Sequence, residues 1–215
     1  ACSSVNRYRN ADKPITEIAS ELGVRWILEG RVQQVENQLR VSVRLIDPNP
    51  GVQTWADSYL YDLSAANLFA AQSEIAHQIA QALETQLTPL EEREVTRKPT
   101  DNLEAYSLFV EARTLLQQRE EPQMRQALRL FTQATEIDPD FALAWVGVAD
   151  SLYELVDYGF QAPDNAVAAA LEAANHALML NPENPEAYVS LGIIHYLQQD
   201  GIVALNLLDK AVQLR

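Results

Sequence analysis

Alternating apolar and polar residues in the first quarter of the chain predict β-strands. From Leu39 to Ile46 every second side chain is apolar, as in a strand with one buried face: Leu39, Val41, Val43 and Leu45. The segment 24–32 is rich in branched residues and predicts a second strand, with Glu36-Asn37 as the hairpin turn between the two. A break at Pro48 to Gly51 separates them from a third predicted strand at 52–59.

Helical spacing predicts one helix before these strands and one after them. Asp12 to Pro14 can open a short helix, which Gly23 would end in a left-handed conformation. Ser64 is a suitable N-cap for a long second helix that ends near residue 94. The apolar stripe of this second helix comprises Leu68, Ile75, Ile79, Leu83, Leu87 and Leu90. The break Arg97-Lys98-Pro99-Thr100 is the predicted domain boundary.

Beyond this boundary one pattern recurs three times. Its first two copies end at Pro139 and Pro182, and an aromatic residue, Trp145 or Tyr188, follows each proline by six residues. Small or apolar residues precede each end at fixed spacing: Ala127, Phe131 and Ala134, then Ala170, Ala174 and Ala177, then Ala204, Leu208 and Ala211. Repetition of this kind is typical of stacked antiparallel helix pairs, because small residues let neighbouring helices approach closely. We therefore expect three helix pairs, at about 103–140, 141–183 and 184–215.

This spacing resembles the tetratricopeptide repeat. The third unit matches best, through Tyr188, Leu191, Gly192, Ala204, Leu208 and Ala211. The second unit carries additional residues at 155–165, and the first unit is degenerate. The resemblance implies an all-α superhelix in which the first helices of successive pairs line a concave groove.

The first half resembles the TolB-like (FlgO-like) α/β module, which commonly precedes tetratricopeptide repeats in bacterial signalling proteins. The matching residues are Ser3-Ser4-Val5, Tyr8, Ile18-Ala19, Glu21 to Val24, Leu28-Glu29-Gly30, Val32, Leu39-Arg40-Val41, Leu45-Ile46-Asp47 and Trp55-Ala56-Asp57. The resemblance implies the C-terminal part of a membrane-anchored regulator. Its output domain would be either a winged-helix DNA-binding domain, as in CadC-like transcription regulators, or a class III adenylate cyclase.

Two departures from the family pattern predict that the chain is a fragment. The family module begins with an earlier strand and helix, so we expect a partial sheet here. Cys2 then lies inside a domain instead of at a lipoprotein cleavage site. The third repeat stops where its proline should follow, so we expect further repeats.

Charge and residue types argue against nucleic-acid binding and catalysis by this segment. The net charge is −14, of which residues 99–215 carry −11, and a nucleic-acid-binding surface must instead neutralise phosphates. The histidines His77, His176 and His195 are scattered, and there are no paired cysteines and no glycine loop for a nucleotide. We expect no catalytic residue, no cofactor and no metal site, with His195 packed between helices.

The remaining function is protein binding in the repeat groove. The predicted groove residues are Tyr106, Phe109, Arg113 and Leu116, then Leu143, Val146, Asp150 and Tyr153, then Glu186, Val189, Ile193 and Tyr196. Asp150 and Ile193 stand where a carboxylate clamp would need asparagine, so apolar anchors of a peptide or helix are the better match. The alternative is that several of these side chains contact a neighbouring repeat or the preceding module.

Together these features predict a partial α+β module at 1–63, a helix at 64–98 that completes and links it, and an all-α repeat superhelix at 99–215. The predicted function is a non-catalytic interaction or sensory region. The leading parent is a CadC-like transcription regulator, with the segment in the periplasm and a membrane anchor upstream. The alternatives are the regulatory region of an adenylate cyclase, in the cytoplasm, and a free-standing scaffold. A homodimer is compatible with each of these.

Overall fold

A computed structural model describes residues 5, 8, 13–47, 55–62 and 64–214. The chain divides into two compact units, Ala1–Arg97 and Lys98–Arg215. The first unit contains a three-stranded sheet with helices, and every regular element described in the second unit is a helix. This agrees with the predicted order of an α+β module followed by helices.

The sheet of the first unit is antiparallel, with the strand order β1-β2-β3. Its strands are β1 (Ile27–Val35), β2 (Gln38–Ile46) and β3 (Trp55–Asp62). Leu39, Val43 and Leu45 are buried, as the alternation predicted. Glu36 adopts a positive φ of 54° in the predicted hairpin turn. The predicted break at Pro48 to Gly51 lies outside the described residues, as do Cys2 and residues 52–54.

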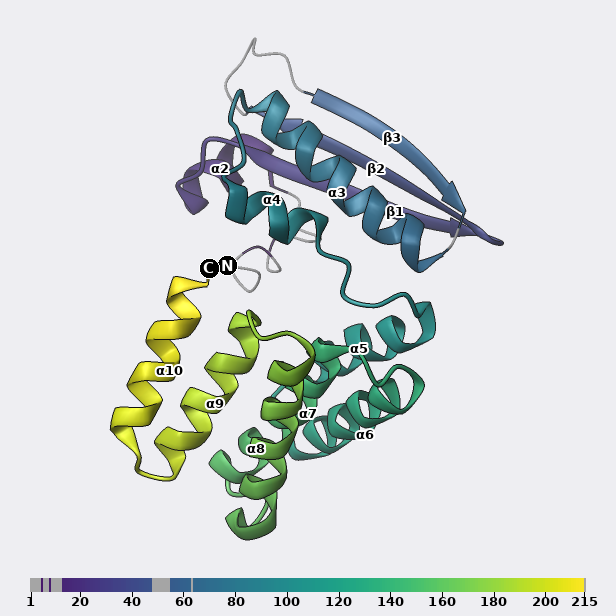
Figure 1. Ribbon diagram of the computed structural model, residues 1–215. Coiled ribbons are helices and arrows are strands. Elements are labelled where there is room, and N and C mark those ends of the chain that lie inside the picture. Colours follow the sequence, from purple (N-terminus) through teal and green to yellow (C-terminus); the bar gives the residue numbers. More distant parts are fainter. Residues whose placement is uncertain (1–4, 6–7, 9–12, 48–54, 63, 215) are drawn as a thin grey trace. The chain divides into compact units, whose positions relative to one another are not determined.

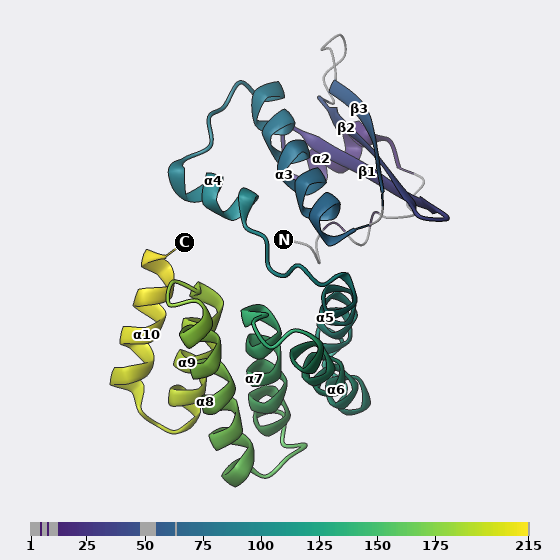
Figure 2. The same ribbon diagram turned by 45° about the vertical axis from the view of Figure 1, so that its right-hand side comes forward.

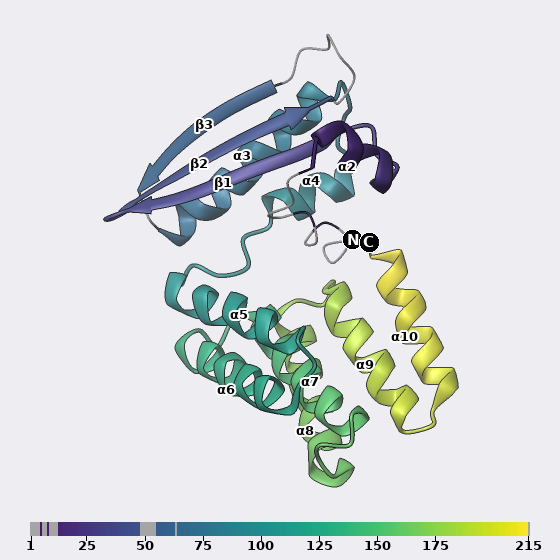
Figure 3. The ribbon, with the colours of Figure 1, turned by 180° about the vertical axis from the view of Figure 1, so that it is seen from behind.

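Helix α3 (Ala65–Ala82) packs against one face of this sheet, through contacts with β2 and β3 (Figure 1). Its buried Phe69 and Ala71 contribute to the core, and Tyr61 Oη on β3 donates a hydrogen bond to Glu74 Oε2 on α3 at 2.6 Å. Seen from behind, the strands lie in front of α3, so the opposite face of the sheet carries no helix along most of its length (Figure 3). An antiparallel sheet with one covered face and one polar face is a common arrangement.

The helix-end predictions for α2 (Ile15–Leu22) and α3 are confirmed. Gly23 ends α2 with φ 64°, and Ser64 Oγ accepts a hydrogen bond from the Asn67 N–H at 3.1 Å. The single long helix predicted up to residue 94 is wrong, because α3 ends at Ala82 and a separate helix, α4 (Pro89–Thr96), follows. Thr88 Oγ1 accepts from the Glu91 N–H and Glu91 Oε2 accepts from the Thr88 N–H, which makes a capping box.

The second unit consists of three helix pairs in chain order, side by side in Figures 1 and 2. The helices are α5 (Leu103–Leu116) with α6 (Glu121–Ile137), α7 (Ala142–Asp157) with α8 (Pro163–Leu180), and α9 (Pro185–Leu197) with α10 (Gly201–Gln213). The predicted small residues are buried: Ala127, Ala134, Ala170, Ala174, Ala177, Ala204 and Ala211. Phe131 is 1% exposed, as its place in the pattern indicated.

The aromatic residue that follows each proline makes the same contact in two repeats. Trp145 Nε1 donates to the Pro139 carbonyl at 2.9 Å, and Tyr188 Oη donates to the Pro182 carbonyl at 3.2 Å. Each side chain therefore combines an apolar ring between helices with a polar tip that satisfies a carbonyl in the preceding turn. This explains why both the aromatic residue and its distance from the proline recur.

The additional residues of the second repeat fold back on the first pair. Gly159, with φ 74°, turns the chain after α7, and Phe160 packs against the core of the first pair. Arg125 on α6 donates a hydrogen bond from Nη2 to the Phe160 carbonyl at 2.8 Å. The same Nη2 also donates to Glu121 Oε1, one turn earlier on α6. The insertion thus closes one side of the first pair.

Gly147 tests how closely the helices approach. A Cβ at this position would lie 2.4 Å from ring atoms of the buried Phe131, so Gly147→Ala should lower the free energy of unfolding by about 1–3 kcal/mol through overpacking. Urea denaturation followed by circular dichroism measures the change. The control is Gly201→Ala, where the added Cβ meets nothing within 4 Å and stability should hold or rise slightly. Equal effects of the two substitutions would contradict the steric explanation.

Candidate protein-binding site

The predicted groove residues fall into four rows across α5, α7 and α9, and their exposure changes from one helix to the next. On α5, Phe109 and Leu116 are buried, and Phe109 lies 5.7 Å from Phe131 and 5.0 Å from Phe141, centroid to centroid. Tyr106 is half-buried and packs against the same core. Of the predicted residues on α5, Arg113 alone is exposed, with its guanidinium 5.6 Å from the Phe109 ring centroid.

On α7 the predicted residues also take part in packing. Val146 is buried in a small cluster with Ala177 and Ala187. Leu143 packs against the first core, and Tyr153 packs against the core between α7, α8 and α9. Phe109, Leu116 and Val146 are therefore core residues in this structure, because the helices approach so closely that these side chains fill the space between them. A partner cannot reach them without moving a helix.

The residues on α9 are the most open of the set. Val189 and Ile193 are half-buried, and Tyr196 is 70% exposed. The three are separated by four and three positions, so they lie on one face of the helix. We call Val189, Ile193 and Tyr196 the α9 face. It contains Tyr196, the most exposed large apolar side chain among the predicted groove residues, while the binding role of all twelve residues remains a prediction.

A half-buried carboxyl group, that of Asp150, joins α7 to α9 beside this face. Ser190 Oγ donates to Asp150 Oδ1 at 2.5 Å, and Ser190 itself is 1% exposed. Asp150 thus faces the neighbouring repeat instead of an open groove, which is the alternative that the sequence left open. The sequence signal for this contact is weak, because a single Asp–Ser pair forty residues apart has no characteristic spacing.

The surroundings of Asp150 favour its neutral form. Burial raises the pKa of this carboxyl to about 7, the hydrogen bond from Ser190 lowers it, and the carboxylates of Glu154 and Glu186 raise it. Burial also raises the pKa of the Glu154 carboxyl, and the charge of Arg119 opposes that shift. Burial raises the pKa of the neighbouring Tyr153 hydroxyl well above its usual range. The junction between the second and third pairs therefore contains several acidic groups with little positive charge.

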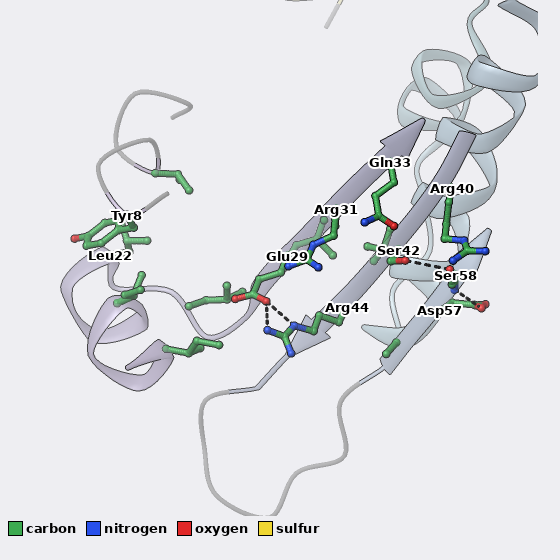
Figure 4. A pocket seen from close by; sticks show the side chains of 18 residues that line it. Tyr8, Leu22, Glu29, Arg31, Gln33, Arg40, Ser42, Arg44, Asp57 and Ser58 are labelled. Carbon is green, nitrogen blue, oxygen red and sulfur yellow. Dashed lines mark hydrogen bonds and ion pairs between the residues drawn. The ribbon is translucent and has the colours of Figure 1, made fainter. Parts of the chain in front are cut away.

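The first unit contains a pocket of about 920 Å³ along the strands (Figure 4). One part of its wall is apolar and includes Leu22 and Ile18 of α2. The remainder is polar, and Arg44 donates from Nε to Glu29 Oε2 at 2.5 Å while Ser42 Oγ and Ser58 Oγ are hydrogen-bonded at 3.0 Å. Asp57, on the same wall, accepts a hydrogen bond from the Ser58 N–H at Oδ1 at 2.7 Å.

The histidines make structural contacts. His176 packs against Trp145 with ring centroids 4.3 Å apart and ring planes tilted by 47°, and His195 Nδ1 lies 3.9 Å from Asp200 Oδ2. His77 lies between the Ser73 carbonyl and Glu92 Oε1, at 2.7 and 2.8 Å. Among the residues that the structure describes, no group of three or more His, Cys, Asp or Glu side chains could hold a metal ion. Within the same ranges, every helix is too short or too polar to cross a lipid bilayer.

A curated relative matches most of the chain. A protein of Rhizobium meliloti (strain 1021) named "Putative adenylate cyclase 3" is 31% identical over 190 residues, which cover 86% of this chain and 32% of that protein. The chain therefore spans about a third of the length of this relative. No protein-family model matches the chain.

Several solved structures of tetratricopeptide proteins are similar in part. The second repeat domain of Spaghetti (RPAP3), bound to an HSP90 peptide, has a TM-score of 0.42 and 14% identity, and covers 53% of this chain and 94% of that chain. YrrB, a repeat protein with an unusual peptide-binding site, has a TM-score of 0.40 and 17% identity, with 70% and 82% covered. MamA from Desulfovibrio magneticus RS-1 has a TM-score of 0.41 and 15% identity, with 70% and 73% covered.

Asp150 predicts a pH dependence of stability. Its pKa in the folded chain, about 7, exceeds its ordinary value of 3.8, so the folded state binds more protons between these values. Its contribution is fully present below about pH 4 and is lost as the pH rises through 7. The amide of Asp150→Asn does not ionise, so the variant does not lose stability in this way. The free energy of unfolding of the variant minus that of the unsubstituted chain should therefore increase by roughly 1–3 kcal/mol from pH 5 to pH 8.

Urea denaturation at a series of pH values measures this difference. Asp164→Asn is a matched control, because Asp164 is exposed in the first turn of α8. The difference in the free energy of unfolding between Asp164→Asn and the unsubstituted chain should not show this increase between pH 5 and pH 8. A difference for Asp150→Asn that stays constant from pH 5 to pH 8 would show that the carboxyl is ionised throughout this range.

Proposed function

We propose that this chain is the non-catalytic, protein-binding region of a larger signalling protein, and that the α9 face is its contact for a peptide or an amphipathic helix. The observation that carries the proposal is Tyr196, an aromatic side chain 70% exposed on the first helix of a repeat pair. Exposed aromatic residues with apolar neighbours on one helix face are typical anchors at protein interfaces. Tyr153 extends this surface onto α7 through its half-buried ring.

The charge of the repeat unit adds a preference among partners. Residues 99–215 carry a net charge of −11, and Glu186 lies on α9 one turn before the α9 face. We propose a partner whose apolar anchors are flanked by basic residues, because opposite charges steer the encounter and like charges disfavour the wrong partner. An acidic peptide of the same apolar pattern would then bind more weakly.

The matched relative favours an adenylate cyclase as the parent protein. The name of this relative supports the cyclase alternative, whereas the CadC-like regulator, the membrane anchor and the periplasmic location are supported by the sequence resemblance alone. In either parent, binding at the α9 face can regulate a distant output only if the partner's affinity differs between two states of the protein. We therefore propose that this region biases the output domain by a population shift.

Removing the Tyr196 ring tests the α9 face. Dodecapeptides displayed on phage are selected against the 215-residue chain, and their affinities are measured by isothermal titration calorimetry. Tyr196→Ala should weaken the selected peptides about tenfold or more, as expected for a central aromatic anchor. Tyr153→Ala is less suitable, because this ring packs against the core.

The matched control is Met179→Ala on α8, the second helix of its pair, where the side chain is 71% exposed. It should leave the same peptides bound with unchanged affinity. The proposal is contradicted if Tyr196→Ala and Met179→Ala have equal effects, or if the selection yields no peptide that binds the chain.

The parent activity is tested with the whole gene. Expressed in a bacterial host that lacks its own adenylate cyclase, the full-length protein should raise cyclic AMP, and deletion of residues 99–215 should change that level without abolishing it. A full-length protein that makes no cyclic AMP and binds a specific DNA sequence would show instead that the parent is a transcription regulator. The Tyr196 test is independent of this result, because it uses the 215-residue chain alone.

A further inference from the structure

The imidazole of His77 makes one hydrogen bond within α3 and one to α4, the helix that lies beside it (Figure 1). Its Nδ1 atom lies 2.7 Å from the Ser73 carbonyl oxygen, one turn earlier on α3. Its Nε2 atom lies 2.8 Å from Glu92 Oε1 on α4. The side chains of His77 and Glu92 are 42% and 47% exposed, so the pair can exchange protons with water.

Both partners of the ring are hydrogen-bond acceptors. A carbonyl oxygen and a carboxylate oxygen have no proton to donate, so each contact needs an N–H on the imidazole. A neutral imidazole carries one N–H and one bare nitrogen, whereas an imidazolium ion carries two N–H groups. In the neutral ring a bare nitrogen would therefore face an oxygen lone pair. The contacts of His77 with Ser73 and Glu92 are both satisfied when the ring is charged.

The surroundings of His77 favour this charged form. The hydrogen bond to the Ser73 carbonyl raises the pKa of His77 above its ordinary value of 6.5, and the hydrogen bond to Glu92 and the charge of Glu92 raise it as well. Desolvation of the ring opposes this shift.

The other elements packed against α3 add no charge that replaces Glu92. The remaining ionisable side chains described on these elements are Arg40 and Arg44 of β2, Asp57, Tyr59, Tyr61 and Asp62 of β3, and Glu91 and Arg93 of α4. Glu92 is the charged side chain among the described residues that shifts the pKa of His77. On α3 itself, Glu74 accepts a hydrogen bond from Tyr61 Oη. Protonation of His77 is therefore tied to the position of Glu92.

Helix α4 depends on this neighbour for its stability. It has eight residues, and isolated helices shorter than about 12–15 residues are marginal in water. The capping box of Thr88 and Glu91 orders its first turn, but the described element against which α4 chiefly packs is α3. Loss of an attractive contact with α3 should therefore shift α4 toward an undocked state.

We propose that His77 and Glu92 form a pH-sensitive latch, which holds α4 on α3 while the imidazole is protonated and releases α4 when the ring loses its proton. The bond to Ser73 needs no ordering of α4, so the neutral ring keeps that bond and turns a bare Nε2 toward the carboxylate. Helix α4 leads into the break that precedes the repeat unit. Its release would make residues 83–99 a longer connection between the two units.

The direction of the pH dependence follows from the raised pKa of His77. The docked state binds more protons than the undocked state between pH 6.5 and this raised value. Docking of α4 is therefore strongest below pH 6.5 and weakens as the pH rises through the pKa of His77. This dependence is separate from the proposed binding of a partner at the α9 face, because the latch lies in the first unit.

Hydrogen exchange of the backbone amides of residues 93–96 measures the docking of α4. The 215-residue chain is used in an Asp150→Asn background, because Asp150 titrates near pH 7 in the second unit. Protection relative to the intrinsic exchange rate should fall between pH 5.5 and pH 8.5. The fall should be about tenfold for each unit by which the pKa of His77, measured by an NMR titration of its ring, exceeds 6.5. The amides of β2 should keep their protection.

Substitutions at His77 should fix the latch in either state. His77→Ala removes the contact, so residues 93–96 should show low protection at every pH. His77→Arg stays charged throughout this range, so protection should stay high. Glu92→Gln should lower the pKa of His77 toward 6.5 and weaken the pH dependence. The matched control is Glu84→Gln, which removes a carboxylate from an exposed position between α3 and α4 and should change neither quantity.

Three results would overturn the latch. The first is protection of residues 93–96 that does not change with pH, and the second is a pH dependence that survives in His77→Ala. The third is an NMR titration that places the pKa of His77 at or below 6.5. If the amides of β2 lose protection together with those of α4, the transition is unfolding of the whole first unit, which also contradicts the proposal.

Discussion

The close approach of paired helices is the constraint on which the repeat unit depends. Alanine and glycine at the facing positions bring the helix backbones together, and large side chains such as Phe131 then occupy nearly all the remaining space. The buried alanines recur at the same spacing in each pair because every pair solves the same packing problem. The recurring bond from Trp145 or Tyr188 to a proline carbonyl fixes the turn between pairs in the same way.

This constraint also decides where a partner can bind. The helices that pack against a position determine whether it is open: Leu116 is buried, Tyr153 is half-buried, and Tyr196 at the same place in the third pair is exposed. Equivalent positions in sequence are thus not equivalent in accessibility. The repeat pattern identifies which side of each helix matters, and the packing of neighbouring helices determines which of those side chains a partner can contact.

Features that depend on regular spacing could be predicted from the sequence. The alternation of β2, the glycine at the end of α2, the serine cap of α3 and the small residues of the helix pairs each have a local or periodic signal. The division between α3 and α4 was missed although Thr88-Pro89 and Glu91 signal it, because the apolar stripe appeared to continue through Leu83 and Leu87. The contact of Ser190 with Asp150 had no such signal, since it depends on how two repeats stack.

Asp150 shows why a binding surface and a packing surface cannot be separated by residue type alone. A carboxyl group at a predicted groove position suggests recognition of a basic ligand, yet here Ser190 holds it and burial favours its neutral form. A protonated carboxyl donates or accepts hydrogen bonds like any neutral polar group, whereas burial and the carboxylates of Glu154 and Glu186 disfavour its ionised form. The protonation state of this residue is therefore a property of the contact between repeats, and the proposed partner contact rests instead on the apolar side chains of α9.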